Sequence, residues 1–300
     1  LPLYHIFALT ANLWCFVRLG GQNVLITNPR DLKSFIKELG KYPFTYLTGV
    51  NTLFNGLNNH PDFKELDFSH LKAAVAGGMA LQPAVARKFE EITGKRVFEG
   101  YGLTEASPVT HFNPLDGTDQ PGTIGIPLPS TDVSVVDDDG NPVAQGERGE
   151  LCIQGPQVMK GYWNRPDETA NTIKGGWLYT GDIAIMQEDG FFQIVDRKKD
   201  MILVSGFNVY PQDVEDALAE HPDVLEAAVI GVDDDKSGEA VKAFVVRKND
   251  SLSTTDLERF ARENLTGYKR PKYIEFREEL PKSNVGKILR KDLKKEEEQK

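Results

Sequence analysis

The chain has 300 residues, 40% of them hydrophobic and 27% charged, with a formal net charge of −10 and an isoelectric point near 5.1. This length predicts two domains. The acidic balance argues against a nucleic-acid-binding protein, because nucleic-acid-binding domains are usually basic. Cys15 and Cys152 match no metal-site or disulfide spacing, so a reducing compartment is the simplest expectation. No apolar run approaches about 18 residues, the length that indicates a membrane-spanning helix.

The first part of the chain alternates helix and strand patterns. Asn28-Pro29 predicts a helix start, because Asn is a good cap and Pro favours the first helical position. Val50–Leu57 predicts a second helix, Ala73–Ala76 a buried strand, and Pro83 the start of a third helix. Strand and helix in alternation indicate a parallel sheet, and α/β folds bind ligands at the carboxyl edge of such a sheet.

The middle of the chain is rich in turns. From residue 113 to 161, Gly and Pro recur between short β-like runs such as Val133–Val136 and Glu150–Ile153. This spacing predicts a small β-barrel or another β-rich subdomain. A Thr-Gly-Asp turn at 180–182 follows, and then an Asp-Gly hairpin signal between the apolar runs Ile183–Met186 and Phe191–Val195.

Five consecutive charges at Asp196–Asp200 mark a change in organisation. Such a run cannot lie in a core, because each charge needs a partner or carries a large desolvation cost. It is therefore expected to be exposed or to face a polar ligand, and a solvated loop is the plainer interpretation. Mixed helix and strand signals follow, at Pro211, Ala227–Val232, Val241–Val246, Ser253 or Thr254, and Tyr273–Phe276. The tail Lys294–Lys300 is expected to fray.

Thr104 and Glu105 follow a glycine-rich turn at the end of a predicted strand. A carboxylate there can hold Mg²⁺, a hydroxyl can reach a phosphate oxygen, and the nearby Tyr101 can stack on a base. A plain turn is the alternative for this segment.

Four other residues carry weaker signals. Asp182 follows the Thr-Gly-Asp turn and can accept hydrogen bonds from ribose, while Arg197 can donate them. Lys287 follows Gly286 on a loop, where an ammonium can stabilise charge in a transition state. The alternatives are a structural turn for Asp182, a solvated lysine at a helix start for Lys287, and a packed core histidine for His5.

Together, eight segments resemble successive motifs of one superfamily, the acyl-adenylate-forming enzymes, which include acyl-CoA synthetases, nonribosomal adenylation domains and luciferases. In chain order they are Leu1–His5, Gly77-Gly78, Tyr101–Glu105, Gly149–Leu151, Tyr179–Asp182, Asp196–Asp200, Ser205–Pro211 and Pro281–Lys287. Within the superfamily, residues 176–199 resemble the signature of fatty acyl-CoA synthetases. Residues 200–211 and the loop at 281–287 are most similar to the bacterial long-chain fatty acid–CoA ligases.

The resemblance implies the fold class α/β plus α+β. It predicts a partial large α/β domain over residues 1–112, a small β-barrel subdomain over 113–198, and a small mobile α+β lid domain over 199–300. It also implies that the chain is a C-terminal portion, because the family's Lys-ended phosphate loop should lie upstream of Leu1.

The implied reaction has two steps. Carboxylate and Mg-ATP first give acyl-AMP and pyrophosphate, and the thiol of coenzyme A then displaces AMP to give acyl-CoA. The implied ligands are therefore a long-chain fatty acid, ATP or AMP, Mg²⁺ and coenzyme A, with a role in β-oxidation. The expected location is the cytoplasm, with peripheral contact at the inner face of the membrane and a homodimer left open.

By motif match, the nucleotide contacts fall in two segments. Glu105 would bind Mg²⁺, and Thr104 would contact the α-phosphate. Tyr101, flanked by the nucleotide-site glycines Gly100 and Gly102, would stack near adenine.

Residues of other motifs would bind the ribose and act in the first chemical step. Asp182 and Arg197 would hold the ribose, and Lys287 would position carboxylate and phosphate in the first step. His5 would border the acyl site.

The remaining assignments concern the acyl site and coenzyme A. Gly77 and Gly78 would border the acyl site together with His5. Ser205-Gly206 would line the pantetheine tunnel, and Lys199 would be the hinge about which the C-terminal domain rotates between half-reactions.

Two rival functions stay open. One is a ligase for medium-chain or aryl acids, and the other is a nucleotide-binding fragment without catalysis, because the phosphate loop is missing from this chain. Luciferase chemistry is not supported, because Leu203 stands where luciferases have a lysine.

Overall fold

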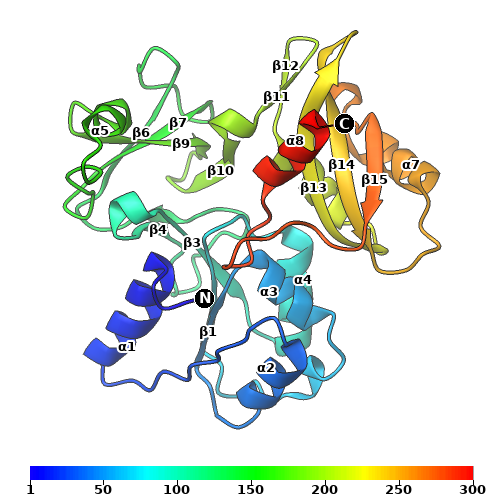
Figure 1. Ribbon diagram of the computed structural model, residues 1–300. Helices are drawn as coiled ribbons and strands as arrows, with labels where there is room; N and C mark the ends of the chain where they lie inside the picture. Colours follow the sequence, from blue (N-terminus) through cyan, green and yellow to red (C-terminus); the bar gives the residue numbers. More distant parts are fainter. Residues whose placement is uncertain (300) are drawn as a thin grey trace. The chain divides into compact units, whose positions relative to one another are not determined.

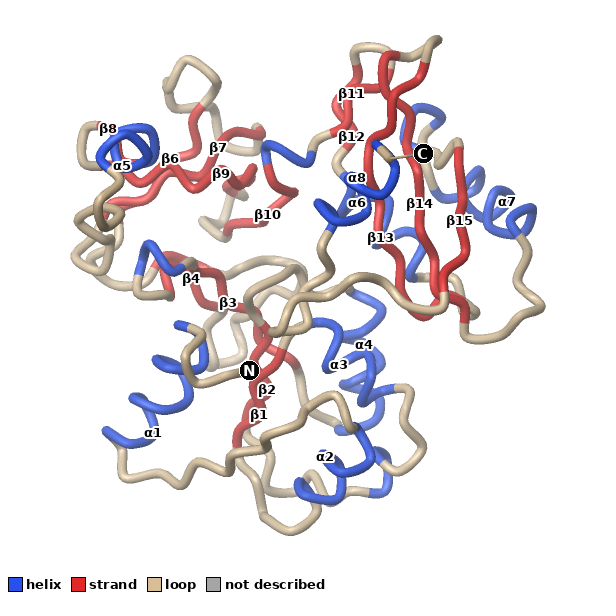
Figure 2. Tube along the Cα trace, in the orientation of Figure 1, coloured by secondary structure: helices blue, strands red, loops and turns tan. Residues whose placement is uncertain are grey.

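The computed structural model, in which residues 1–299 are described, divides the chain into two compact units, Leu1–Ile194 and Val195–Lys300 (Figure 1). Figure 2 shows that each unit contains both helices and sheet. The predicted α/β plus α+β fold class is therefore confirmed. No helix of residues 1–299 has the length and apolar character needed to cross a membrane.

The first sheet has the strand order β1-β2-β3-β4-β5. Its parallel part consists of β1 (Tyr46–Gly49), β2 (Ala73–Ala76) and β3 (Val97–Gly102), and its antiparallel part of β4 (Val109–Phe112) and β5 (Ile126–Pro127). Helices α3 (Asn51–Asn58) and α4 (Pro83–Thr93) connect the parallel strands. The predicted strand–helix–strand pattern is confirmed.

Aromatic packing closes the core beside this sheet. Phe54, Phe63 and Phe89 are fully buried, and the rings of Phe54 and Phe89 meet edge to face with 5.2 Å between centroids. These rings come from α3, α4 and the short turn Phe63–Glu65, so they join the two connecting helices to each other.

Helix α2 (Leu32–Leu39) starts three residues later than Asn28-Pro29 predicts. Asp31 is its cap, because the Asp31 carboxylate accepts the Ser34 amide at 3.0 Å and the Ser34 hydroxyl at 2.6 Å. The side chain of Asn28 instead accepts the Arg30 amide at 3.3 Å in a local turn.

The N-terminal helix was not predicted from the sequence. It consists of a π-helical segment, Ala8–Trp14, followed by α1 (Cys15–Arg18).

The second sheet of the first unit has the order β10-β9-β7-β6, with β8 paired to β9. Its elements are β6 (Asp132–Val136), β7 (Arg148–Gln154), α5 (Pro166–Thr172), β8 (Ile173–Lys174), β9 (Trp177–Met186) and β10 (Phe192–Arg197). The closed barrel is not formed, since β6 and β10 are the two ends of the strand order in the described chain. The other predicted alternative, a β-rich subdomain with a β9–β10 hairpin, is what the structure contains.

The second unit is built on one mixed sheet with the order β12-β11-β14-β13, to which β15 adds in parallel beside β14. Its strands are β11 (Ile202–Val204), β12 (Phe207–Val209), β13 (Val224–Asp234), β14 (Gly238–Arg247) and β15 (Tyr273–Arg277). Its helices are α6 (Pro211–Ala219), α7 (Thr254–Asn264) and α8 (Arg290–Glu298), with short 3₁₀ turns at Lys198–Asp200 and Gly267–Lys269.

Alternating side chains of β13 and β14 serve two different cores, as the period of a strand requires. Val229 packs with Leu218 of α6 and Leu257 of α7, whereas the next residue, Ile230, packs with Leu293 of α8. Both faces of the sheet are thus covered. Ser253 caps α7 in a capping box with Asp256, which confirms the first of the two predicted caps.

The expected fraying of Lys294–Lys300 is wrong as far as Glu298, because this segment belongs to α8; Lys300 lies outside the described residues. Leu293 is fully buried. Glu297 is 2.7 Å from the ammonium of the buried Lys242, so both apolar and ionic contacts hold the helix.

Candidate functional site

The glycines at the end of β3 allow the neighbouring strand to come close. A Cβ on Gly102 would lie 2.1 Å from the Pro108 carbonyl oxygen, and one on Gly100 would lie 2.7 Å from the Phe112 ring. Gly100 and Gly102 therefore belong to a strand rather than to the turn that the sequence predicts, and their lack of a side chain is explained by strand packing.

Thr104 and Glu105 come directly after β3 in a 3₁₀ turn, Thr104–Ala106. Thr104 is exposed and Glu105 is half-buried. The hydroxyl of Tyr162 donates a hydrogen bond to Glu105 Oε1 at 2.8 Å, and the Met159 amide donates to the Glu105 carbonyl at 2.7 Å. Burial and this bond raise the pKa of Tyr162, so it stays a donor.

Asp182 lies on a bulge of β9. Between the pairs Glu150–Ile183 and Cys152–Tyr179, strand β9 has two more residues than β7, and Gly181 takes φ +73°. The predicted Thr-Gly-Asp turn is therefore a bulge inside a strand. The bulge is held in place by the Gly181 amide, which donates to Glu150 at 3.0 Å.

The structure joins two of the predicted nucleotide residues. The Tyr101 hydroxyl donates to Asp182 Oδ2 at 2.6 Å, although the two residues are far apart in sequence. A short bond between a phenol and a carboxylate is of the strong, charge-assisted kind. It brings the end of β3 and the bulge of β9 to one place.

Of the predicted acyl-site residues, Gly77 follows β2 and lies close to β3 and to the N-terminal segment. A Cβ on Gly77 would lie 3.2 Å from the Gly100 carbonyl oxygen and 3.2 Å from the ring of Phe7, while Gly78 has φ +80°. His5 is half-buried, and its Nδ1 accepts the Phe7 amide at 3.3 Å. The N-terminal segment thus lies beside Gly77.

In the second unit, Arg197 is the last residue of β10, whereas Lys199, Ser205 and Gly206 lie in turns. Arg197 and Lys199 are exposed. Ser205 and Gly206 are exposed and form the two-residue turn between β11 and β12, with φ +50° and +84°. Two positive φ values are the signature of a type I′ hairpin turn.

Lys287 lies on a small hairpin and not at the helix start, because α8 begins three residues later at Arg290. The Ser283 amide donates to the Lys287 carbonyl at 2.8 Å, and the Gly286 amide donates to Ser283 at 2.9 Å. Gly286 has φ +81°, which glycine adopts easily. The Leu289 amide closes the base of the hairpin on Pro281 at 2.8 Å.

The charged run Asp196–Asp200 is not uniformly exposed, and this corrects the sequence-based expectation. Asp196 is buried and pairs with Arg290, whose Nη1 lies 2.8 Å from Asp196 Oδ1. Burial by itself lowers the pKa of Arg290, but the charges of Glu215 and Asp196 outweigh it and raise that pKa. No local pattern in the sequence points to this pairing, because Asp196 and Arg290 are far apart in the chain.

Residues 1–299 contain no group of three or more His, Cys, Asp or Glu side chains placed to hold a metal ion. A preformed protein cage is therefore absent from this part of the chain. Mg²⁺ is often bound through one or two carboxylates together with substrate phosphates, and Glu105 fits that kind of site.

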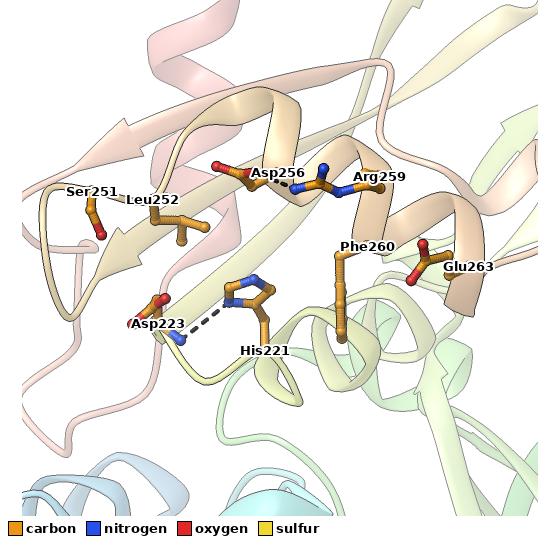
Figure 3. A pocket seen from close by; sticks show the side chains of 8 residues that line it. All are labelled: His221, Asp223, Ser251, Leu252, Asp256, Arg259, Phe260 and Glu263. Carbon is orange, nitrogen blue, oxygen red and sulfur yellow. Dashed lines mark hydrogen bonds and ion pairs between the residues drawn. The ribbon is translucent and has the colours of Figure 1, made fainter.

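A cavity of about 310 Å³ lies between the turn after α6 and helix α7 (Figure 3). The rings of His221 and Phe260 meet edge to face across it, and Asp256 pairs with Arg259 at 2.5 Å. None of the residues predicted from the sequence to form the site lines this cavity.

Sequence reasoning missed two titratable groups near β3, the buried His111 and the half-buried Glu99. Burial lowers the pKa of His111 to about 3, so the imidazole is neutral. Burial also raises the pKa of Glu99 to about 7, although the Gly122 amide donates to it at 2.9 Å. Neither residue type carries a local signal for such an environment, because burial here comes from strand packing.

Comparison with known proteins matches both units. The family described as AMP-binding enzyme matches residues 1–163, and the AMP-binding enzyme C-terminal domain matches residues 213–287. Two relatives named long-chain-fatty-acid–CoA ligase are 60% identical over 296 residues (Escherichia coli O157:H7) and 47% identical over 298 residues (Bacillus subtilis strain 168). Both alignments cover 99% of this chain and 53% of the relative.

A solved structure gives the same picture. The chain matches an anthranilate CoA ligase in complex with anthranoyl-AMP with a TM-score of 0.93 and 31% identity, covering 98% of this chain and 58% of that one. The chain therefore spans about half the length of the relatives that it matches.

Glu99 gives a prediction on stability. Because the folded state raises its pKa from 4.5 to about 7, the folded chain binds this proton more tightly than the unfolded chain. The contribution to the free energy of unfolding is full below pH 4.5 and falls by about 3 kcal/mol as the pH rises through 7. Glu99→Gln should flatten this dependence, as measured by urea unfolding between pH 4.5 and 8. Exposed Glu65→Gln is the matched control, and an equal pH slope in the Glu99 variant and the wild type would contradict the assignment.

Proposed function

Since the chain belongs to the family of AMP-binding enzymes, we propose that its protein joins a long-chain fatty acid to coenzyme A in two steps that consume ATP. In the first step the carboxylate attacks the α-phosphorus of ATP, giving acyl-AMP and pyrophosphate. In the second step the thiol sulfur of coenzyme A attacks the acyl carbon, AMP leaves, and the thiol proton is released. The observation that carries the proposal is the site at the end of β3, where Tyr101 binds Asp182 and Glu105 follows in the next turn, in a chain 60% identical to a ligase of this name.

The cluster supports a nucleotide site on three grounds. Thr104 is exposed and can donate its hydroxyl to a phosphate oxygen. Glu105 has Oε1 held by Tyr162, which leaves Oε2 to face Mg²⁺. The bond from Tyr101 orients the Asp182 carboxylate, whose lone pairs suit the two ribose hydroxyls.

Residues of the second unit complete the proposal. Arg197 donates to the ribose, and Lys287 stabilises charge on the carboxylate and phosphate during the first step. Ser205 and Gly206 line the path of the pantetheine arm. The second unit changes orientation between the half-reactions by rotation about Lys199.

The acyl substrate has one rival with support of its own. The matched solved structure is an anthranilate CoA ligase, which acts on an aryl acid. ATP–pyrophosphate exchange with a series of carboxylic acids tests the proposal in the full-length protein. We expect exchange to be greatest with long-chain fatty acids, and preference for an aryl or medium-chain acid would overturn that part. Because the chain spans 53% of its relatives, we expect residues 1–300 alone to form no acyl-CoA.

Lys287 is the first residue to test. Lys287→Ala in the full-length protein should lower acyl-AMP formation by roughly 10²–10³-fold, the scale for losing one transition-state donor. Thioester formation from preformed acyl-AMP should fall much less. The two rates are measured separately under single-turnover conditions, with the exposed Lys295→Ala on α8 as a control, and equal losses in both steps would count against this role.

Lys199, the predicted hinge, is the second residue to test. Proline fixes φ near −65° and restricts the preceding Lys198, so Lys199→Pro should trap one arrangement of the two units. We expect acyl-AMP formation to persist and thioester formation to be lost. Lys199→Ala keeps the backbone mobile and should retain more of the second step. Parallel loss of both steps in a variant that is well folded by circular dichroism would refute the hinge.

Tyr162, which binds Glu105, is the third residue to test. Tyr162→Phe removes the hydrogen bond that orients Glu105, so the Mg²⁺ concentration at half-maximal rate should rise by roughly tenfold to hundredfold, the effect of losing a hydrogen bond to a charged group. A Mg²⁺ titration of acyl-AMP formation measures this. Exposed Tyr42→Phe is the matched control, and a lower maximal rate at an unchanged Mg²⁺ midpoint would show that Tyr162 does not act through Glu105.

A further inference from the structure

Arg290 binds three carboxylates at once. Its Nε and Nη2 lie 2.9 Å and 2.6 Å from the two oxygens of Glu215. Its Nη1 lies 2.8 Å from Asp196 and 3.5 Å from Asp200. The side chains of Arg290 and its partners are all less than one-fifth exposed. Pairs of this kind are screened little by solvent and have a fixed geometry.

Two of these partners are themselves fastened to the body of the second unit. Asp196 Oδ2 accepts the Gln212 amide in the first turn of α6 at 2.7 Å. Glu215 Oε1 accepts the Val229 amide of β13 at 2.8 Å. The guanidinium is therefore held between helix α6, strand β13 and the beginning of the unit.

The same arginine follows the hairpin that carries Lys287. That hairpin is closed by the Ser283–Lys287 and Leu289–Pro281 backbone bonds, and an ion pair of 2.7 Å between Lys282 and Glu226 fastens its other strand. Because its own backbone hydrogen bonds hold the hairpin together, a displacement of Arg290 moves the whole hairpin as a rigid unit. The position of Lys287 thus depends on what Arg290 binds.

The contacts with Asp196 and Asp200 have a particular place in the chain. The first unit ends at Ile194 and the second begins at Val195, so these two carboxylates lie just after the junction. We propose that Arg290 is a positioning residue for Lys287, which fixes the Lys287 hairpin to the junction segment through Asp196 and Asp200. The proposal rests on the proposed function, in which Lys287 acts in the formation of acyl-AMP.

A consequence for the reaction order follows from the spacing. Asp196 and Asp200 flank Lys199, so a change of backbone angles at Lys199 moves the two carboxylates relative to each other. The Nη1 atom of Arg290 cannot stay in contact with both carboxylates, so its contact with Asp196 is lost. The closed arrangement serves the first half-reaction, and the second half-reaction does not need it.

We call the contacts of Arg290 with Asp196 and Asp200 the clamp. Two variants test it in the full-length protein. Asp196→Asn removes the charge with little change in shape, and Arg290→Lys keeps the charge but loses the planar fork. Each should lower acyl-AMP formation by about tenfold, within the range for coupled residues of one network. Thioester formation from preformed acyl-AMP should be unchanged. The double variant should be no slower than the slower single variant.

Glu297→Gln is the matched control, because it removes a carboxylate contact at the other end of the same helix α8. It should leave both half-reactions unchanged. Equal losses in both steps for Asp196→Asn, or additive effects in the double variant, would overturn the proposal.

Amide hydrogen exchange gives a readout that does not depend on activity. Asp196→Asn should speed exchange of the Ser283, Gly286 and Leu289 amides in the hairpin, and Glu297→Gln should not. Unchanged protection of these amides would refute the clamp whatever the rates. If the wild type forms no acyl-AMP but the amides respond as expected, the clamp stands and the proposed function fails.

Discussion

The close packing of β3, β4 and the start of β5 is the constraint on which the candidate nucleotide site depends. Backbone atoms fill the space where side chains of Gly102 and Gly125 would be. A Cβ on Gly102 would lie 2.1 Å from the Pro108 carbonyl oxygen, and one on Gly125 would lie 2.1 Å from the Phe112 carbonyl carbon. A side chain at either position would separate the strands. Tyr101 would then lose its alignment with Asp182, and the turn that carries Glu105 would shift with it.

Electrostatics has a different task in each unit. Around β3, hydrogen bonds from tyrosine hydroxyls orient carboxylates that stay within reach of solvent. Beside α8, one guanidinium satisfies several carboxylates in a largely dry place, where an unpaired charge would cost several kcal/mol. Exposed pairs such as Arg165–Glu168 contribute at most about 1 kcal/mol, so their number says little about the fold.

Local patterns in the sequence predict the regular elements well. Pro83 begins α4, the Ala73–Ala76 run is β2, and Ser253 caps α7, because each of these signals acts within one turn or strand. The motif resemblance identifies the family correctly, whereas the roles that it implies for the candidate residues stay predictions. The predicted start of α2 is wrong because Asp31, with Ser34 three residues later, is a better cap than Asn28.

The structural features that could not be predicted from the sequence depend on residues that are distant in the chain. The burial of Asp196 needs Arg290, and the order of the C-terminal tail needs the pocket that receives Leu293. The Thr180–Asp182 bulge could not be told from a turn, because a bulge exists only relative to the strand beside it. The Tyr162 contact to Glu105 likewise joins segments that share no local pattern.

Strand β1 is at one end of the first sheet in the described chain, and this has a consequence for handling the protein. Its residues alternate between exposed Tyr46 and buried Leu47, so one of its edges offers amide and carbonyl groups next to apolar surface. An edge of this kind is a template for pairing with another chain. Concentrated solutions of residues 1–300 alone should therefore be prone to association through β1, and a lysine or proline on this edge is the natural way to suppress it.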